Sequence, residues 1–381
     1  MKKQYIFKQM FVLLLCLSTT AVFFNSCGDS GFWAKTVQTP VLTPEIYPGD
    51  QANPYIITTP EQLDAVRNNL SAYYKLGNDI DLRAYLASGG VAGWKPIGSG
   101  ANPFTGNFDG SGYKIIGLHI SNPSLPAVGL FSYIEGGIVK NIGLENVSIS
   151  STYSGVGGVV GQVGINGSIT NCYVTGNING TYAVGGVVGQ VGINGCITSC
   201  YSTTNVHSDG QFVGGVAGEV QGSLANCYAT GGVNGDGCVG GVAGLVNAGA
   251  NVTNCYASGA ISGNFSIGGV VGYDDSNNVC ISNCVALNPS ITYGAGGNDR
   301  VLGYNEKQGI ITLSNNWANS AMILNGPTIE VNKGNNTEGG ADCDAIPAAS
   351  WWTTPAPNGP GWDSSVWYFE DGKLPILQWQ R

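Results

Sequence analysis

The chain is poor in charge, and what it lacks excludes several classes of function. Only 10% of its 381 residues are charged, and no lysine or arginine occurs between residues 141 and 299. Its two histidines, His119 and His207, are not part of a His-Glu-x-x-His motif, so the zinc site of a metalloprotease is missing. The formal net charge is −9, which argues against nucleic acid or anionic membrane surfaces as partners.

Helix-forming patterns are also scarce, whereas glycine is abundant. Glycine accounts for 60 residues, and hydrophobic residues make up 43% of the chain. The hydrophobic content excludes a disordered polar chain, and the frequent glycines together with short apolar runs exclude a mainly helical protein. Short strands joined by Gly/Asn turns are therefore expected.

One unit is repeated five times between residues 156 and 286. Each copy begins with Gly-Gly-Val-x-Gly, at residues 157, 185, 214, 240 and 268, and later carries a cysteine that is usually preceded by Asn and followed by Tyr. A nearly constant period of this size is typical of stacked supersecondary units. The leucine framework of leucine-rich repeats is absent, and propeller blades are longer. The sequence therefore predicts an all-β fold, a parallel β-helix (β-solenoid) of about seven coils.

Equivalent residues of such a solenoid should form ladders, with inward positions filled by the same branched side chains. Two series meet this condition: Val159, Val187, Val216, Val242 and Val270, and Ile169, Ile197, Leu224, Val252 and Ile281. The position of Gln162 varies between copies and is predicted to face solvent. The paired glycines are expected to mark a bend where no Cβ fits.

These motifs resemble the GLUG repeat of bacterial surface proteins. The Val-Gly-Gly-Val-Val-Gly core followed by Asn-Cys-Tyr covers residues 155–290 well and residues 128–320 loosely. Members of that group include lipoproteins of unknown role and the non-catalytic portion of immunoglobulin A1-cleaving metalloproteases. The resemblance implies a solenoid at a cell surface, and it does not imply protease activity.

The first 26 residues are predicted to be a signal peptide, because lysines precede an apolar run. The following Cys27 resembles the acylated first residue of a mature lipoprotein, although a plain secretory signal is the alternative. Lipid on Cys27 would anchor the chain to the outer membrane or cell surface after Sec-type export, with no other contact to the membrane. Residues 27–50, which contain three prolines, are expected to be a tether.

Caps are expected at both ends of the solenoid, because its open ends would otherwise pair with other chains. Residues 51–127 are assigned to an N-terminal cap and first strands, with one short helix over 59–70 that starts at the N-cap Thr59. The Asp79-Ile80-Asp81-Leu82 segment is interpreted as a strand rather than a calcium site. Residues 128–320 form the repeats, and residues 321–381 an aromatic-rich C-terminal cap that should cover the last coil; an aromatic ligand platform is the alternative.

The cysteines of the repeats share one position and should form one column. Their parallel side chains oppose disulfide geometry, so we expect reduced, buried thiols. A linear column also cannot supply a tetrahedral metal cage, and no metal or cofactor is predicted. The column members are Cys172, Cys200, Cys227, Cys255 and Cys284.

Two functional hypotheses follow, together with a passive surface spacer. The first is a non-enzymatic surface solenoid that binds glycans or host matrix proteins through a tyrosine column, Tyr173, Tyr201, Tyr228 and Tyr256. Whether these rings point outward or pack under turns is left open by their spacing. The second is a polysaccharide-degrading β-helix enzyme that uses Asp209 and Asp236 as an acid/base pair, but both precede glycine, as in ordinary turns. The oligomeric state is not predicted.

Overall fold

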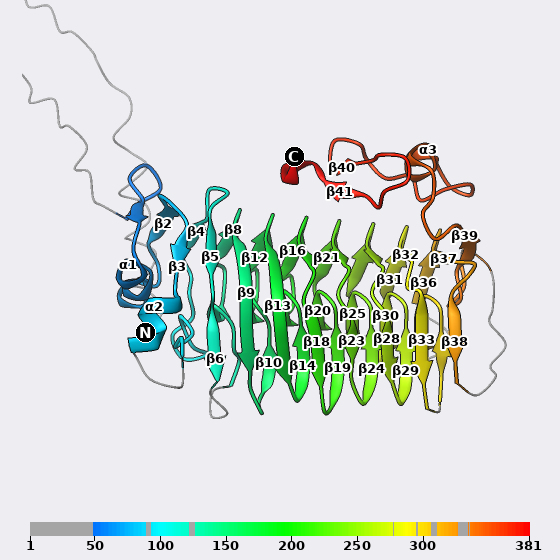
Figure 1. The fold of residues 1–381 in the computed structure, drawn as a ribbon, viewed down its shortest axis with the longest axis horizontal. Helices are drawn as coiled ribbons and strands as arrows, with labels where there is room; N and C mark the ends of the chain where they lie inside the picture. The colour runs from blue at the N-terminus through cyan, green and yellow to red at the C-terminus, as the bar shows by residue number, and fades with distance from the viewer. Residues whose placement is uncertain are drawn as a thin grey trace, which may run out of the picture. The chain divides into compact units, whose positions relative to one another are not determined.

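The computed structural model describes residues 49–88, 93–121, 126–276, 278–294, 296–305, 311–326, 334 and 336–381. The predicted signal peptide, Cys27 and nearly all of the predicted tether lie outside these residues. The described residues belong to one compact unit, in which parallel strands stack in successive coils (Figure 1). One complete coil runs through β10 (Ser154–Val156), β11 (Val160–Val163), β12 (Ser168–Thr170) and β13 (Tyr173–Gly180).

Four parallel sheets run along the stack. The seven-stranded sheet contains β7 (Phe131–Ile134), β11, β15 (Val188–Val191), β20 (Ala217–Val220), β25 (Ala243–Val246), β30 (Val271–Asp274) and β35 (Leu302–Asn305). The six-stranded sheet contains β10, β14 (Tyr182–Gly185), β19 (Gln211–Gly214), β24 (Gly237–Gly240), β29 (Phe265–Gly268) and β34 (Asn298–Asp299). The seven rungs of the first of these sheets confirm the predicted β-solenoid of about seven coils.

The ten-stranded sheet continues beyond the repeats towards the N-terminus. It contains β1 (Tyr55–Ile57), β2 (Tyr73–Leu76), β4 (Asn107–Asp109), β8 (Ile138–Lys140), β12, β16 (Cys196–Thr198), β21 (Ser223–Ala225), β26 (Asn251–Thr253), β31 (Val279–Ser282) and β36 (Ile311–Ser314). Three rungs therefore come from the segment that was expected to be the N-terminal cap and first strands.

The sixteen-stranded sheet holds the strand that follows each repeat cysteine and its continuation. One series runs β9 (Gly143–Ser150), β13, β17 (Tyr201–Ser202), β22 (Tyr228–Ala229), β27 (Tyr256–Ala257), β32 (Val285–Ala286), β37 (Trp317–Asn319) and β39 (Ala341–Cys343). The other continues from β13 through β18 (Asn205–Ser208), β23 (Val233–Asn234), β28 (Ile261–Gly263), β33 (Ser290–Tyr293) and β38 (Ile323–Asn325). The short strands β3 (Ile80–Asp81), β5 (Lys114–Ile116) and β6 (His119–Ser121) complete it.

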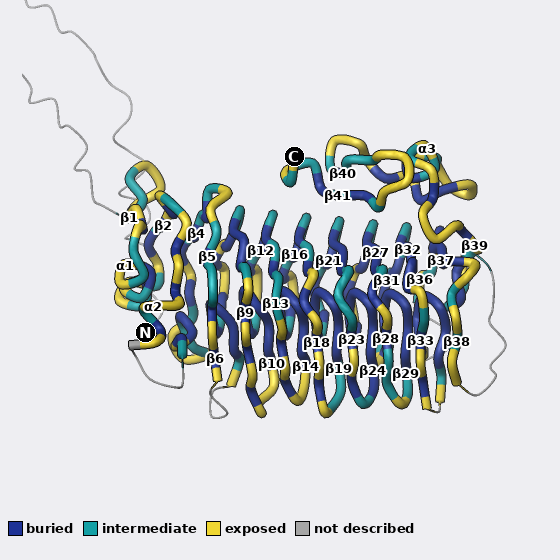
Figure 2. The backbone as a smooth tube through the Cα atoms, viewed as in Figure 1, coloured by how far each residue is buried: buried dark blue, intermediate teal, exposed yellow. Residues whose placement is uncertain are grey.

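The predicted ladders are confirmed by the register of the strands. The Val187 amide donates to the Val216 carbonyl of the next coil at 2.9 Å, and Ile169 is paired with Ile197. Every member of both predicted inward series is fully buried, and buried residues line the interior along the stack (Figure 2). Each such side chain contributes about 1.5–3 kcal/mol through burial. The predicted outward column holds except at Leu245, which is buried between its register neighbours Glu219 and Tyr273.

Asparagines turn the chain between the ten-stranded and sixteen-stranded sheets. Asn171 and its equivalents adopt φ angles of 52–55°, a left-handed conformation that Asn tolerates better than most residues. Their amides form a ladder from coil to coil, for example Asn254 Nδ2 to Asn226 Oδ1 at 3.1 Å. The ladder is interrupted at Ser199. The paired glycines also behave as predicted, because a Cβ on Gly186 would lie 2.2 Å from the Gly215 carbonyl oxygen.

The N-terminal helix is shorter than predicted. α1 (Pro60–Asp64) continues as a 3₁₀ turn, Ala65–Asn68, and the Thr59 and Gln62 side chains form a reciprocal capping box. A second helix, α2 (Arg83–Ser88), was not predicted, because its six residues follow a strand pattern too closely to show a helical period. Ile80 and Leu82 are buried while Asp79 and Asp81 are exposed, which agrees with the strand interpretation.

The nine described cysteines are all free thiols. Each repeat cysteine is buried and its Sγ donates to a carbonyl two residues earlier, as Cys200 does to Thr198 at 3.2 Å. Burial raises the pKa of the Cys172, Cys227 and Cys284 thiols, so they stay protonated donors. All five repeat cysteines are fully buried, so the column acts as small hydrophobic packing.

Candidate functional site

The four tyrosines form a continuous stack. Their rings are parallel to within 5° in each neighbouring pair, with centroids 5.1 Å apart for Tyr173–Tyr201 and 4.8 Å for Tyr201–Tyr228 and Tyr228–Tyr256. Each tyrosine follows a repeat cysteine whose side chain fills the interior, so the pleat directs the tyrosine away from the core. The tyrosine side chains therefore point outward, which settles the direction that the sequence left open.

Most of this stack is covered by the last part of the chain. Residues 349–381, here called the cap segment, contain α3 (Ala349–Thr353), the antiparallel pair β40 (Trp367–Tyr368) and β41 (Ile376–Leu377), and a final 3₁₀ turn, Gln378–Gln380. Three tryptophans of the cap segment pack around Tyr256, with centroids 5.9–6.2 Å from its ring: Trp352, Trp362 and Trp367. The Tyr256 hydroxyl donates to the Pro375 carbonyl at 2.7 Å.

The cap segment corrects two predictions. It was expected to cover the last coil, and Trp351 does pack on Trp317 there, but the segment also runs back along the side of the stack. Consequently Tyr228 is only 4% exposed and Tyr256 only 1% exposed, and neither can belong to an accessible binding face. Tyrosine and tryptophan bury large apolar areas, which is the physical reason that the two aromatic groups cover one another.

The stack remains open at its N-terminal end. Tyr173 and Tyr201 are half-buried, and Trp379 lies against both, with centroids 6.3 and 5.7 Å away. The Trp379 indole donates to the Ser199 carbonyl at 3.0 Å, at the coil where the asparagine ladder is interrupted. In the preceding coil the position of the tyrosine is taken by Gly143, so no further aromatic ring continues the stack.

A pocket of about 350 Å³ adjoins this open end. We call it the aromatic pocket, and it is lined by Asp109, Ser111, Gly112, Asn141, Ile142, Gly143, Tyr173 and Trp379. Asp109 Oδ1 accepts hydrogen bonds from the Ser111 amide at 2.8 Å and from Asn141 Nδ2 at 3.0 Å. Although partial burial opposes it, these donors and nearby Lys140 hold the pKa of Asp109 below its ordinary value. The pocket thus combines two aromatic side chains with fixed polar groups.

The Tyr173 ring is oriented by its hydroxyl. It donates to Glu145 Oε1 at 2.8 Å, and Lys114 Nζ lies 3.1 Å from Glu145 Oε2. Although burial alone would raise it, the hydrogen bonds from Tyr173 and Lys114 lower the pKa of Glu145. Burial and the contact with this carboxylate raise the pKa of Tyr173, so the phenol stays a neutral donor and is unsuited to act as a base.

Asp209 and Asp236 lie on adjacent coils, as expected from the repeats. The Asp236 amide donates to the Gly210 carbonyl at 2.9 Å. The Asp209 side chain is 89% exposed and lies 3.3 Å from His207 Nε2, while Asp236 Oδ1 accepts from Asn264 Nδ2 at 2.6 Å. Each carboxylate therefore interacts with a different polar neighbour, Asp209 with His207 and Asp236 with Asn264.

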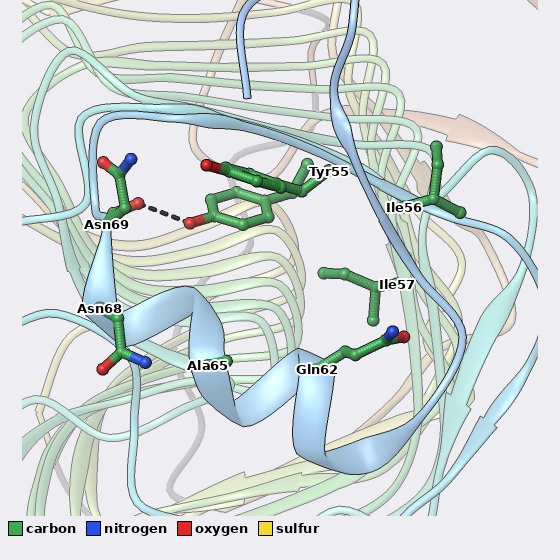
Figure 3. Close-up of a pocket in the computed structure, with 8 residues that line it drawn as sticks. Tyr55, Ile56, Ile57, Gln62, Ala65, Asn68 and Asn69 are labelled. Atoms are coloured by element: carbon green, nitrogen blue, oxygen red, sulfur yellow. Dashed lines mark hydrogen bonds between the residues drawn. The ribbon is translucent and has the colours of Figure 1, made fainter. Parts of the chain in front are cut away.

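A second pocket, of about 280 Å³, lies under α1 (Figure 3). Tyr55, Ile56 and Ile57 of β1 form one wall, and the helical segment supplies the other through Gln62, Ala65, Asn68 and Asn69. The Tyr74 hydroxyl donates to the Asn69 carbonyl at 2.7 Å. This pocket is where the helical segment closes over the first strands.

Within the described part of the chain, no group of three or more His, Cys, Asp and Glu side chains is arranged to hold a metal ion. None of the helices in that part is long and apolar enough to cross a membrane.

Comparison with protein families matches residues 152–179, most of the first complete coil, to the GLUG motif. The chain is a GLUG-containing β-solenoid. A protein of Evansella cellulosilytica named "Putative Gly-rich membrane protein" is 41% identical over 119 residues, which cover 30% of this chain and 14% of that protein. Halomucin of Haloquadratum walsbyi is 34% identical over 143 residues, or 35% of this chain and 2% of halomucin. The chain thus spans a small fraction of the curated relatives it matches.

Solved structures share the fold of the GLUG solenoid. A Bacteroides ovatus protein described as a "putative immunoglobulin A1 protease" superposes with a TM-score of 0.60 and 24% identity, over 87% of this chain and 94% of that one. A structure described as "IgA1 Protease" gives a TM-score of 0.51 and 18% identity, over 72% of this chain and 22% of that one. At these identities the likeness shows the fold alone.

Of the eight residues that line the aromatic pocket, only Tyr173 was identified from the sequence as a site residue, and the polar or aromatic residues Trp379, Asp109 and Asn141 were among those missed. Trp379 was expected to be part of a cap, and its contact with Ser199 joins residues 180 positions apart. Its neighbours Gln378 and Gln380 gave no periodic signal that would have placed it beside the repeats.

Proposed function

We propose that this chain is a non-enzymatic, surface-displayed β-solenoid that binds glycans through the aromatic pocket. The observation that carries the proposal is the open end of the tyrosine stack, where Tyr173 and Trp379 flank a pocket with fixed polar groups. Aromatic faces pack against the apolar faces of sugar rings, and a few placed polar groups set orientation. The predicted lipidation of Cys27 and the names of the two curated relatives support display at the cell surface.

A glycan array with the purified full-length protein tests this proposal. Binding should weaken about two- to twelvefold in Trp379→Ala and in Tyr173→Ala, because each variant removes an aromatic contact worth about 0.5–1.5 kcal/mol. Tyr182→Ala is the matched control, since Tyr182 is 40% exposed on the six-stranded sheet, outside the pocket. If the protein binds matrix proteins but no glycan, the target of the solenoid is a matrix protein rather than a glycan.

The competing hypothesis is a polysaccharide-degrading enzyme that uses Asp209 and Asp236. It predicts new reducing or unsaturated ends from a broad polysaccharide panel, with loss of activity in Asp209→Asn. We propose no such activity, because each carboxylate already interacts with another side chain, and the Asp209 side chain is 89% exposed. If the protein neither binds a ligand nor degrades a polysaccharide, the remaining hypothesis is a passive surface spacer.

A further inference from the structure

A third pocket, of about 400 Å³, adjoins the aromatic pocket and shares Asp109 with it. It contains two lysines, and we call it the lysine pocket; its lining residues are Gln51, Ala52, Pro54, Tyr73, Tyr74, Lys75, Asn107, Asp109 and Lys140. The two pockets therefore adjoin at Asp109, with aromatic side chains lining one and lysines lining the other.

The register of the ten-stranded sheet fixes the order of the charged groups. Lys75 of β2 pairs with Asp109 of β4, and Asp109 pairs with Lys140 of β8. The three residues thus stand on consecutive rungs, which places the two lysine Cα atoms about 10 Å apart. Lys140 Nζ lies 3.4 Å from Asp109 Oδ2.

The charges of this triad leave a net positive site. Asp109 receives hydrogen bonds from Ser111 and Asn141 as well as its ion pair, so most of its acceptor capacity is used within the protein. Lys75 is exposed, and among the described residues its ammonium has no ion-pair or hydrogen-bond partner. The pocket therefore contains one carboxylate and two ammonium groups, and only the Lys140 ammonium is paired with that carboxylate.

This site differs from the rest of the molecule. Six of the basic residues fall between positions 67 and 140 and none between 141 and 299, although the chain as a whole carries a net charge of −9. A general attraction for polyanions is therefore excluded, and affinity for an anion has to come from local contacts. Lys75 and Lys140 are the basic residues that line the lysine pocket.

We propose that the glycan held at the aromatic pocket is anionic, and that Lys75 and Lys140 bind its carboxylate or sulfate group in the lysine pocket. This inference rests on the proposed glycan-binding function. A sugar ring packed on Tyr173 and Trp379 would direct the neighbouring unit of the same chain across Asp109 towards the lysines. Ammonium groups bind such anions through charge-assisted hydrogen bonds.

A chemically matched probe series tests the inference on the full-length protein. Chondroitin sulfate carries both anionic groups, desulfated chondroitin carries only the carboxylate, and carboxyl-reduced desulfated chondroitin is neutral. Oligogalacturonate and its methyl ester form a second acidic and neutral pair. We expect the acidic member of at least one series to bind at least fivefold more tightly than its neutral member, with the difference shrinking between 50 and 300 mM NaCl. The first two chondroitin probes separate sulfate from carboxylate recognition.

Variants then locate the effect. Lys75→Gln and Lys140→Gln should each weaken binding of the acidic probe about fivefold and leave neutral glycans unaffected. Lys95→Gln is the matched control, because Lys95 lies outside both pockets. Lys140→Gln also removes the ion pair with Asp109, so thermal unfolding is measured alongside; Lys75→Gln has no such contact to lose.

The possible failures are distinguishable. Equal affinity for acidic and neutral probes, or unchanged acidic binding in both lysine variants, overturns the inference while glycan binding at Tyr173 and Trp379 stands. If only neutral glycans bind, the inference of an anionic ligand is likewise overturned, and glycan binding at Tyr173 and Trp379 stands. If no glycan on the array binds, the proposed function itself is wrong, and the inference falls with it.

Discussion

Asp274 occupies a position that the preceding coils fill with valine. Its column along the seven-stranded sheet contains Val163, Val191, Val220 and Val246 in the four preceding coils, and its partner in the next coil is Asn305. The side chain is fully buried, and Oδ1 accepts from the Ser276 amide at 3.0 Å, while Oδ2 has no hydrogen-bond partner among the described residues. Burial raises the pKa of Asp274, and the neighbouring Asp275 carboxylate raises it further. A single residue therefore makes the stability of the last coils depend on pH.

Replacing Asp274 by valine should stabilise the protein most at high pH. Because the folded-state pKa lies above the ordinary value of 3.8, the favourable contribution of the protonated acid is present below that pH and is lost as pH rises through the folded-state pKa. At pH 8, Asp274→Val should raise the free energy of unfolding by about 1–3 kcal/mol, and by less at pH 4. Urea unfolding at pH 4, 6 and 8 measures this. The exposed Asp344→Asn serves as control, and equal pH slopes in wild type and Asp274→Val would contradict the prediction.

At the scale of an element, the asparagine ladder makes the corner between two sheets. Asn254 donates to Asn226 and accepts from Asn283 Nδ2 at 3.2 Å, at a φ angle of 52°. Asn254→Gly removes the two hydrogen bonds but keeps the left-handed conformation accessible. Asn254→Ala removes the same hydrogen bonds and also makes the left-handed conformation unfavourable. We expect losses of about 1–3 kcal/mol for glycine and about 1 kcal/mol more for alanine. Thermal and urea unfolding compare the two variants. Equal stability of Asn254→Ala and Asn254→Gly would show that the left-handed conformation at residue 254 costs little.

The cap segment is a second element whose stability can be tested separately. Trp367 is fully buried and packs on Tyr228, Tyr256 and Trp362, with its ring centroid 4.5 Å from that of Trp362. Trp367→Ala should cost about 3–5 kcal/mol of packing and release the cap segment from the tyrosine stack. Chymotrypsin should then cleave within residues 349–381, while far-UV circular dichroism of the repeats is retained.

Trp379→Ala provides the comparison for this experiment. Trp379 is 36% exposed and lies at the far end of the cap segment, so its loss should leave the packing around Trp367 intact. Equal protease resistance of Trp367→Ala and wild type would mean that the cap segment does not depend on its tryptophan core.

At the scale of the whole molecule, the predicted lipid on Cys27 would decide where the solenoid is displayed. Cys27→Ser should abolish labelling by palmitate and shift the protein from the membrane to the soluble fraction of a bacterial host, because acyl chains supply about 0.8 kcal/mol of membrane binding per buried CH₂. Cys16→Ser, within the predicted signal peptide, is the control. Unchanged labelling in Cys27→Ser would favour the plain secretory signal.

The sequence by itself determined the repeating part of the fold. Identical side chains stack in a parallel solenoid, so the repeats predicted the β-solenoid, its seven rungs, the buried columns around Val187 and Ile169, and the glycine bends. The tyrosine column was found for the same reason. Local signals also located the N-cap Thr59, although the helix ends earlier than its apolar pattern indicated.

Only the tertiary structure decided which part of the tyrosine column is accessible. The cap segment does not repeat, and its contacts join residues more than a hundred positions apart, such as Tyr256 with Pro375 and Trp379 with Ser199. No periodicity reports such contacts, because they depend on shape and burial rather than on spacing along the chain. The same is true of the aromatic and lysine pockets, which arise where Gly143 ends the stack and consecutive rungs bring Lys75, Asp109 and Lys140 together.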